Sequence, residues 1–128
     1  MQLRVGCNKL GKRLMRVHLL GASALAALMA APAAVRAEDP PTFHLTLKNH
    51  VFDPAELTVP AGKRVVLIVR NTDDTPAEFE SSQLGAEKVI SAGREATIRI
   101  GPLAAGQYPF VDEFHQQQAH GVLIATGE

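Results

Sequence analysis

The feature that most constrains the fold of this chain is a series of short segments in which apolar and polar residues alternate. Residues 43–48 (FHLTLK) and 95–100 (EATIRI) alternate in this way, and residues 64–70 form an apolar, β-branched run suited to a central strand. Side chains of a strand point alternately to its two faces, so a period of two buries one face of each segment. No segment between residues 43 and 126 has a convincing helical period. The sequence therefore predicts an all-β protein.

About eight strands are expected, separated by turns rich in proline and glycine. The expected strands cover residues 43–48, 57–59, 64–70, 77–81, 87–90, 95–100, 107–112 and 121–126. Residues 52–56 (FDPAE) are interpreted as a turn and residues 71–76 (NTDDTP) as a polar loop. Short strands at this spacing are typical of two sheets packed face to face. We therefore expect a Greek-key β-sandwich.

The first 37 residues are expected to form a secretory signal peptide and not a part of the fold. Basic residues precede an apolar run from residue 17 to about residue 34, and Val35-Arg36-Ala37 has the small-x-small pattern of a cleavage site. The alternative is a retained membrane anchor, which is disfavoured because the run is short for a spanning helix and contains Pro32. The mature domain then covers residues 38–128, and its predicted location is the periplasm.

Cleavage of the leader changes the charge balance. The whole chain has 13 basic and 13 acidic residues, and six of the basic residues lie in the leader. Seven basic and 13 acidic residues remain, which gives residues 38–128 a net charge of −6. An acidic domain is not suited to nucleic acid or to an anionic membrane surface, so any membrane association is expected to be peripheral. The single cysteine, Cys7, also leaves with the leader, and the mature domain has neither a disulfide nor a thiolate.

The segment before the C-terminus carries the first candidate metal ligands. Tyr108, Phe110 and Asp112 share one face of the strand expected at residues 107–112. Two aromatic side chains on that face are expected to point into the core, which places Asp112 at the inner end of the same strand. A buried carboxylate needs a metal or a cationic partner, and the alternative is a solvated aspartate in the loop. His115 follows three residues later, either as a second ligand or as a plain surface histidine.

Several motifs together resemble the cupredoxin-like family. They are Phe52-x-Pro54, residues 57–62 (LTVPAG), the strand at residues 65–71, Gly106-x-Tyr108-x-Phe110, and Phe114-His115. A narrower subgroup, the periplasmic cupredoxin-like components of bacterial ferrous-iron uptake systems, is resembled by residues 76–81 (PAEFES), Glu87-Lys88, Gly93 and Pro102-Leu103, together with the Gly106-x-Tyr108-x-Phe110 and Phe114-His115 motifs. The resemblance spans nearly all of residues 43–126. It implies a role in handling or oxidising Fe²⁺ before a membrane permease, with copper as a candidate bound metal.

The family pattern also implies which positions bind metal. A blue-copper loop has a cysteine where this chain has Asp112, a histidine where it has His115, and a methionine near Ala119 and His120. The resemblance therefore implies metal binding through Asp112 and His115. Counting from His115 assigns the methionine position to His120, whereas counting back from Gly121 assigns it to Ala119, and both alternatives stay open. Without a thiolate, no blue-copper centre is expected.

A second group of candidate ligands is acidic. The remaining ligand of the family pattern, a histidine after the first long loop, falls at Ala77, which cannot bind metal. Glu78 and Glu80 flank Phe79 and would share the face opposite to it, and Glu87 from the next segment can join them. These glutamates are predicted as metal ligands, and a solvated strand face is the alternative.

Ligand chemistry narrows the candidate metals. Carboxylate and imidazole donors suit Fe²⁺, Mn²⁺, Zn²⁺ and Cu²⁺, and raw affinity favours Cu²⁺ over Fe²⁺. Copper, iron or both are therefore the expected ions. A hard anionic site also stabilises Fe³⁺ over Fe²⁺, which agrees with copper-assisted ferrous oxidation but does not establish an enzyme. His44 and His50, on the first strand and at its end, are interpreted as structural residues.

The leading hypothesis is a periplasmic metal-binding protein that handles or oxidises ferrous iron. Its expected partner is an iron permease or another periplasmic uptake component. One alternative is a copper-binding chaperone or buffer without redox activity, and another is a metal-free interaction subunit. The sequence has no nucleophile–base arrangement, phosphate-binding loop or zinc-finger spacing, so hydrolytic chemistry has no support.

Overall fold

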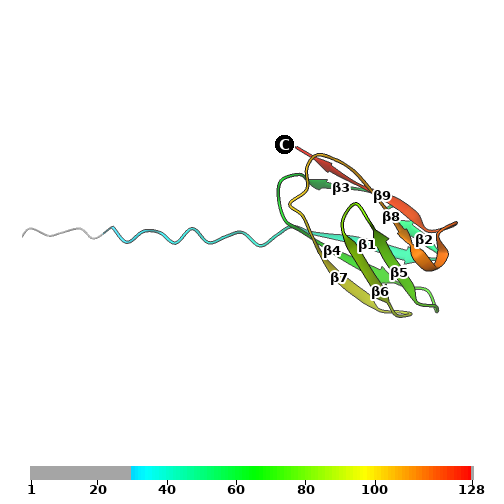
Figure 1. The fold of residues 1–128 in the computed structure, drawn as a ribbon. Helices are drawn as coiled ribbons and strands as arrows, with labels where there is room; N and C mark the ends of the chain where they lie inside the picture. The colour runs from blue at the N-terminus through cyan, green and yellow to red at the C-terminus, as the bar shows by residue number, and fades with distance from the viewer. Residues whose placement is uncertain (1–29, 128) are drawn as a thin grey trace, which may run out of the picture. The chain divides into compact units, whose positions relative to one another are not determined.

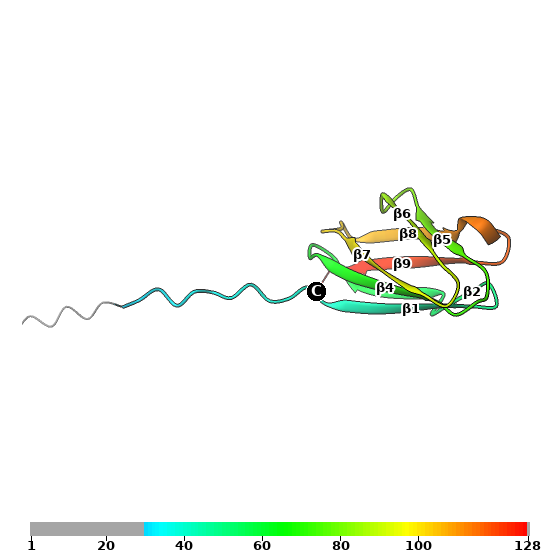
Figure 2. The same cartoon turned by 90° about the horizontal axis from the view of Figure 1, so that it is seen from below.

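A computed structural model of the chain describes residues 30–127. Within them nine strands form two sheets that pack face to face (Figures 1 and 2). In chain order the strands are β1 (Thr42–Lys48), β2 (Val51–Asp53), β3 (Glu56–Pro60), β4 (Val65–Asn71), β5 (Ala77–Ser81), β6 (Ala86–Ile90), β7 (Glu95–Ile100), β8 (Gly106–Asp112) and β9 (His120–Thr126). A single 3-10 turn, η1 (Glu113–His115), connects β8 to β9. The fold is the expected all-β sandwich.

The strand order gives each sheet a mixed, crossed-over topology. One sheet has the order β2-β1-β4-β7, and the other has the order β3-β9-β8-β5-β6. β1 runs parallel to β4 and β3 runs parallel to β9, while the other pairs are antiparallel. Figure 2 shows β1 and β4 in one layer and β8 and β9 in the other. Parallel neighbours require the chain to cross between the layers, as Greek-key connections do.

The eight strands expected from the sequence are all present, with ends that agree to within one residue. Two elements differ from expectation. Residues 51–53, part of which was expected to be a turn, form the short strand β2, which pairs with β1 and buries Phe52. The second is η1, which follows β8 directly. Neither element has a clear sequence signal, because three residues are too few for a strand or helix period to be seen.

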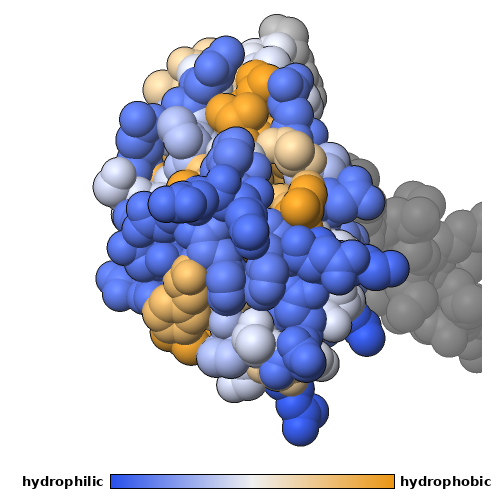
Figure 3. All heavy atoms as spheres, turned by 90° about the vertical axis from the view of Figure 1, so that its right-hand side faces the viewer, coloured by the Kyte–Doolittle hydropathy of each residue, from blue (hydrophilic) through white to orange (hydrophobic). Residues whose placement is uncertain are grey.

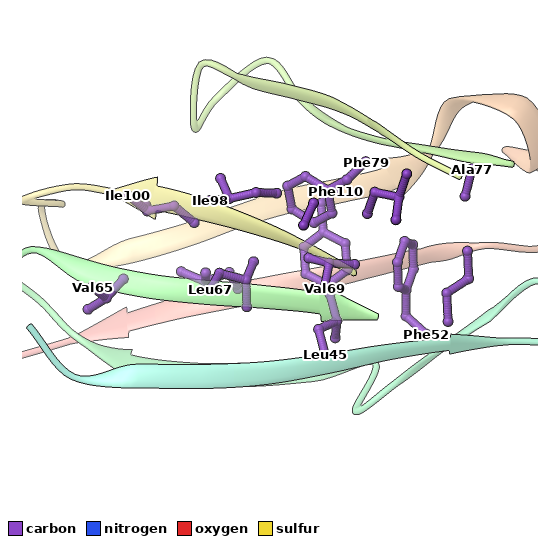
Figure 4. Packing of buried hydrophobic residues seen from close by; sticks show 14 of the residues in the cluster. Leu45, Phe52, Val65, Leu67, Val69, Ala77, Phe79, Ile98, Ile100 and Phe110 are labelled. Atoms are coloured by element: carbon purple, nitrogen blue, oxygen red, sulfur yellow. The ribbon is translucent and has the colours of Figure 1, made fainter. Parts of the chain in front are cut away.

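Three phenylalanines lie at the centre of the core (Figure 4). The rings of Phe79 and Phe110 stack with centroids 5.2 Å apart, and Phe52 meets Phe110 edge to face at 5.1 Å. These are favoured aromatic geometries that add to the burial of apolar surface. Phe52 comes from one sheet, whereas Phe79 and Phe110 come from the other. The cluster therefore joins the two layers close to the end of β8, where Asp112 lies.

Gly121 permits this packing of Phe110. The two residues face each other across β8 and β9. A Cβ atom at Gly121 would lie 2.6 Å from Phe110 Cζ and 2.7 Å from the carbonyl oxygen of Ala55. Because one of these neighbours is backbone, no simple rotamer change relieves the contact. Gly121 is therefore needed for the close approach of the aromatic ring and the chain.

The chain enters the domain at one end of β1, and the β1–β2 turn lies at the other end (Figure 1). Residues 30–41 form neither strand nor helix. The signal peptide predicted for residues 1–37 falls largely on residues 1–29, which lie outside the described residues. Among residues 30–127, no helix has the length and apolar character needed to cross a membrane. The end of the domain opposite to the entry of the chain carries η1 and the site described next.

Candidate metal centre

Three potential metal donors converge at the end of the sandwich that carries η1. Asp112 is the last residue of β8, His115 is the last residue of η1, and His50 lies in the turn between β1 and β2. One ligand atom from each of these side chains lies within 4.8 Å of the others. Figure 3 looks onto this end, where hydrophilic residues cover most of the surface and apolar residues form separate spots. We call His50, Asp112 and His115 the donor cluster.

Asp112 is the buried member of the donor cluster, with no exposed surface. Its Oδ1 accepts hydrogen bonds from the backbone N–H of Glu78 at 2.9 Å and of Phe114 at 3.1 Å. The second of these bonds caps the start of η1. Its Oδ2 lies 2.8 Å from His115 Nδ1. The backbone therefore occupies Oδ1, and Oδ2 is the oxygen that faces the imidazole and a potential ion.

The two histidines of the donor cluster lie face to face. The ring centroids of His50 and His115 are 3.8 Å apart, and the ring planes differ by 21°. Their side chains are 31% and 26% exposed, so both are reachable from solvent while Asp112 is not. Imidazole lone pairs lie in the ring plane, and these two planes are nearly parallel. A single ion held by both rings therefore requires at least one of them to turn out of the stack.

The turn that carries His50 has an unusual backbone. Asn49 and His50 have φ angles of 51° and 56°, the left-handed region for both residues. A two-residue hairpin loop with this conformation matches the type I′ turn, whose favoured sequence is Asn-Gly. A histidine at the second position costs local strain that a glycine would avoid. Asp73 offsets part of this cost, because its carboxylate accepts the backbone N–H of both Asn49 and His50.

One ring nitrogen of His50 has no hydrogen-bond partner among residues 30–127. This nitrogen, Nδ1, is buried. It lies 3.4 Å from Asp73 Oδ2, which is within ion-pair distance, although the alignment is too poor for a hydrogen bond. A buried polar atom without a partner costs free energy. The nitrogen is thus held near a carboxylate without forming the bond that would satisfy it.

The structure places the predicted site residues in two separate groups. Asp112 and His115 lie together, in the order and at the strand end that the sequence suggested. His120 is exposed at the start of β9, opposite Val111, and lies outside the donor cluster. Ala119 is buried and takes part in main-chain hydrogen bonds, in one of which its carbonyl oxygen accepts from the backbone N–H of Asp112. Neither residue supplies a donor to the cluster.

Glu78, Glu80 and Glu87 occupy the outer face of β5 and β6, and we call them the acidic face. Phe79 is buried, so the glutamates on either side of it point away from the core. Glu80 lies directly opposite Glu87. A hydrogen bond that the protonated carboxyl of Glu78 donates to Glu87 raises the pKa of Glu78 above its usual range, and partial burial and repulsion from neighbouring carboxylates raise it further. These residues lie outside the donor cluster, and metal binding by them stays a prediction.

His50 is the residue that the sequence analysis did not assign to the site. It was interpreted as structural because it follows a strand. A signal was nevertheless present, since Asn49-His50 stands where a hairpin would favour Asn-Gly, between two segments that pair as β1 and β2. A side chain in place of that glycine is a deviation from local preference, and such deviations are typical of functional sites.

The donor set fits a borderline transition metal. It consists of two imidazoles and one carboxylate oxygen. In metal sites a hydrogen bond to the ring nitrogen that does not bind the ion usually orients the imidazole, and the unpartnered nitrogen of His50 is available for such a bond. No thiolate lies in residues 38–128, so a copper–sulfur bond is excluded there. Imidazole suits copper, zinc and iron, whereas the carboxylate favours the harder, more highly charged ion. Once one imidazole turns out of the stack, the three side chains can bind an ion and leave coordination positions on the solvent side open.

Comparison with known proteins identifies related chains. A model of the family described as cupredoxin-like domain matches residues 19–125. An uncharacterized protein of Rickettsia prowazekii (strain Madrid E) is 39% identical over 82 residues, a match that covers 64% of this chain and 66% of the relative. The match thus spans slightly less than two thirds of the relative's length.

Solved structures share the fold. Auracyanin A, a "blue" copper protein of Chloroflexus aurantiacus, has a TM-score of 0.59 at 16% identity, and the match covers 69% of this chain and all of that one. The metal-binding domain of the Cu(I)-exporting P-type ATPase of Streptococcus pneumoniae, solved with Cu(I), has a TM-score of 0.59 at 17% identity, with coverage of 71% and 91%. At these identities the likeness concerns the fold alone.

Proposed function

This chain belongs to the cupredoxin-like domain family, and we propose that it binds one copper ion through His50, Asp112 and His115. The observation that carries the proposal is the convergence of three donor atoms within 4.8 Å from three separate segments of the chain. A chance surface cluster rarely includes a fully buried carboxylate that is oriented by backbone hydrogen bonds. Asp112 is such a carboxylate.

Copper is favoured over other ions by the donor set. Among divalent first-row ions, Cu²⁺ binds most tightly to nitrogen and oxygen donors. Two of the structural neighbours, the auracyanin and the ATPase domain, are described as a copper protein and as a structure with Cu(I). Because this chain shares their fold, we propose that it also binds copper. The ligands nevertheless differ from a blue-copper site, because Asp112 occupies the expected cysteine position.

The protein side chains have distinct tasks in this proposal. Asp112 supplies a negative charge through Oδ2 and is held by two backbone N–H groups, so its position is fixed before an ion arrives. His115 and His50 supply neutral donors on the side that solvent reaches. A bound Cu²⁺ can accept one electron, and a carboxylate ligand favours the higher oxidation state and lowers the reduction potential. A site of this kind is expected to be pale and not intensely blue.

We further propose that the substrate is ferrous iron in the periplasm. The support is the resemblance of residues 76–81 and of Phe114-His115 to the cupredoxin-like components of bacterial ferrous-iron uptake systems. In this role the bound Cu²⁺ would accept the electron that Fe²⁺ loses, and O₂ or another electron acceptor would reoxidise the resulting Cu⁺. The ferric ion then passes to an iron permease or another uptake component. The leader at residues 1–37 would direct the protein to that compartment.

The copper site is tested by titrating the purified protein with Cu²⁺ in the presence of a competing chelator. We expect one ion per chain, and we expect His115→Ala to weaken binding by at least ten-fold because it removes one ligand and the partner of Asp112 Oδ2. His44→Ala is the matched control, since His44 is exposed on β1 and lies outside the donor cluster. Equal loss in both variants, or no loss in His115→Ala, would refute the site.

The iron role is tested by following Fe²⁺ oxidation at neutral pH with copper-loaded, copper-free and His115→Ala protein. A rate above background only in the copper-loaded wild type supports oxidation. Tight copper binding without any rate would instead favour the chaperone or buffer function. The partial exposure of both histidines is compatible with ligand exchange in that case. The two assays together separate metal binding from redox activity.

A further inference from the structure

We infer that Asp73 is a positioning residue for the copper site and that it acts through His50 as a carboxylate–histidine–metal triad. The inference rests on the proposed copper site and adds a residue that lies outside the donor cluster. Asp73 belongs to the loop between β4 and β5, which the sequence analysis treated only as a polar connection. Its carboxylate would fix both the backbone of the β1–β2 turn and the orientation of the His50 ring.

The first support is the pair of backbone hydrogen bonds to the turn. Asp73 Oδ1 accepts from the N–H of Asn49, and Asp73 Oδ2 accepts from the N–H of His50 at 2.9 Å. Both donors belong to residues in the left-handed region, which is a costly conformation for residues other than glycine. One carboxylate from a segment more than 20 residues away thus holds the turn that carries a predicted ligand.

The second support is the position of His50 Nδ1. This nitrogen is buried, accepts or donates no hydrogen bond within the described part of the chain, and lies 3.4 Å from Asp73 Oδ2. A histidine that binds metal through one nitrogen commonly donates the N–H of the other to a carboxylate, which fixes the tautomer and the ring. With Nδ1–H directed at Asp73, Nε2 is the nitrogen left for the ion.

Asp73 is itself fixed by a buried residue. Asn71 has no exposed surface, and its Oδ1 accepts the backbone N–H of Asp73 at 3.0 Å. Its Nδ2 donates to the carbonyl oxygens of Thr75 at 2.8 Å and Ile90 at 3.1 Å. The loop is therefore pinned on both sides of Asp73, and the carboxylate is not a freely moving surface group. A rigid support of this kind is what an outer residue needs in order to orient a ligand.

The next residue offers a matched control. Asp74 is exposed, carries the same charge and lies outside the donor cluster. Replacement of Asp73 or Asp74 by asparagine removes one negative charge from the same loop. Any general electrostatic effect on a cation should therefore be similar in the two variants. A difference between them isolates the contacts that Asp73 makes with the β1–β2 turn and with the His50 ring.

The experiment measures Cu²⁺ affinity by chelator competition in four variants of the full chain. They are Asp73→Asn, Asp74→Asn, His50→Gly, and the double variant Asp73→Asn/His50→Gly. Glycine suits the left-handed turn, so His50→Gly removes the imidazole without straining the backbone. We expect Asp73→Asn to weaken binding by about 10- to 100-fold and Asp74→Asn to change it by less than about three-fold.

The double variant decides whether Asp73 acts through His50. If it does, Asp73→Asn causes no further loss once His50 is glycine, because the residue through which it acts is gone. Additive losses in the double variant would overturn the inference. Electron paramagnetic resonance gives a second readout, because Asp73→Asn should alter the nitrogen hyperfine pattern of bound Cu²⁺, whereas Asp74→Asn should leave it unchanged. An unaltered pattern in Asp73→Asn would also overturn it.

Two further outcomes keep the inference separate from the proposed function. Wild-type protein that binds no copper, or copper binding that survives His115→Ala, refutes the copper site itself. Copper binding that is lost in His115→Ala but is equal in wild type and Asp73→Asn refutes only the role of Asp73. If Asp73→Asn fails to fold, Asp73→Ser is the second variant. The serine hydroxyl can accept one N–H of the turn, but it is shorter than a carboxylate and cannot also contact the His50 ring. Wild-type affinity in folded Asp73→Ser would count against the inference.

Discussion

The donor cluster and the acidic face differ in how their polar groups are held, although the sequence marked candidate metal ligands in both. In the donor cluster, Asp112 is buried and oriented by two backbone N–H groups, and its partners come from separate elements. On the acidic face, Glu78 and Glu80 project from one strand toward solvent. Their acidic neighbour Glu87 raises the pKa of Glu78, and among the described residues no imidazole or thiolate groups with these carboxylates as a metal donor.

This difference shows that a high density of acidic residues is a weaker sign of a site than convergence. Like charges opposite each other on a sheet repel, and water screens them when they are exposed. A buried carboxylate must instead accept hydrogen bonds or bind an ion, so donors have to be placed at fixed positions around it. The donor cluster meets that condition through backbone, imidazole and loop contacts, whereas the acidic face has the properties of a solvated strand surface.

The largest expected effect concerns copper affinity. Replacing Asp112 and His115 together by alanine should weaken Cu²⁺ binding by about 100-fold or more. Two ligands are lost, and this loss should exceed the roughly 10- to 100-fold effect of removing a residue that only hydrogen-bonds to a ligand. Replacing Glu78, Glu80 and Glu87 together by glutamine should change the affinity by less than about three-fold at moderate salt. Isothermal titration of both variants makes the comparison. A larger loss in the glutamine variant would move the site to the acidic face.

The next effect concerns the stability of the metal-free protein. Asp112→Ala leaves the N–H groups of Glu78 and Phe114 without their acceptor, which should lower the free energy of unfolding by about 2–4 kcal/mol. Asp112→Asn keeps an oxygen acceptor and should cost about 1 kcal/mol. Urea denaturation with a chelator present measures both values. Equal losses in the two variants would show that the hydrogen bonds to Oδ1 are not the cause.

A smaller effect is expected on the acidic face. Glu80 lies directly opposite Glu87, so Glu80→Lys replaces a repulsive pair by an attractive one. The free energy of unfolding should rise by about 0.2–1 kcal/mol. The same denaturation assay at low ionic strength measures the gain, and added salt should reduce it. A loss of stability would mean that Glu80 has a favourable contact that the repulsion argument omits.

The smallest effect is a pH dependence carried by Glu78. Its pKa is raised mainly by the hydrogen bond with Glu87, so the folded protein binds this proton more tightly than the unfolded chain does. The stability of the wild type should therefore fall as the pH rises from the ordinary glutamate value of 4.5 through the raised pKa. Glu78→Gln should lack that decline. Melting temperatures recorded across this pH range compare the two, and parallel curves would contradict the prediction.

The fold could be predicted from the sequence because its signals are repeated and local. Alternating segments such as residues 95–100 and turn residues such as Gly62 and Gly93 mark each strand and its ends. Strand β2 could not be predicted in this way, because a three-residue strand is defined by its pairing with β1 and not by its own pattern. The same holds for η1, whose start is fixed by the Asp112 side chain.

The site could be predicted only in part. Asp112 and His115 are close in sequence, so their proximity follows from a short connection after β8. His50 is brought to them by the sandwich, from a turn more than 60 positions earlier in the chain. Asp73 is linked to that turn by hydrogen bonds from the backbone N–H groups of Asn49 and His50, and no sequence period predicts such contacts. The burial of Phe79 directs Glu78 and Glu80 outward, as the alternation of the strand predicted, and metal binding by these glutamates stays a prediction.

The direction of β1 has a practical consequence for any measurement on this protein. Its seven residues separate the entry of the chain at Thr42 from the His50 turn, a span of roughly 20 Å. A linker placed ahead of Thr42 would attach the protein to an electrode or bead by the end remote from the histidines. Reagents in free solution would still meet the imidazoles directly, whereas current from the electrode would have to cross the length of the sandwich. If the proposed copper ion is bound, protein mounted in this way should respond readily to dissolved reductants and only weakly to the applied voltage.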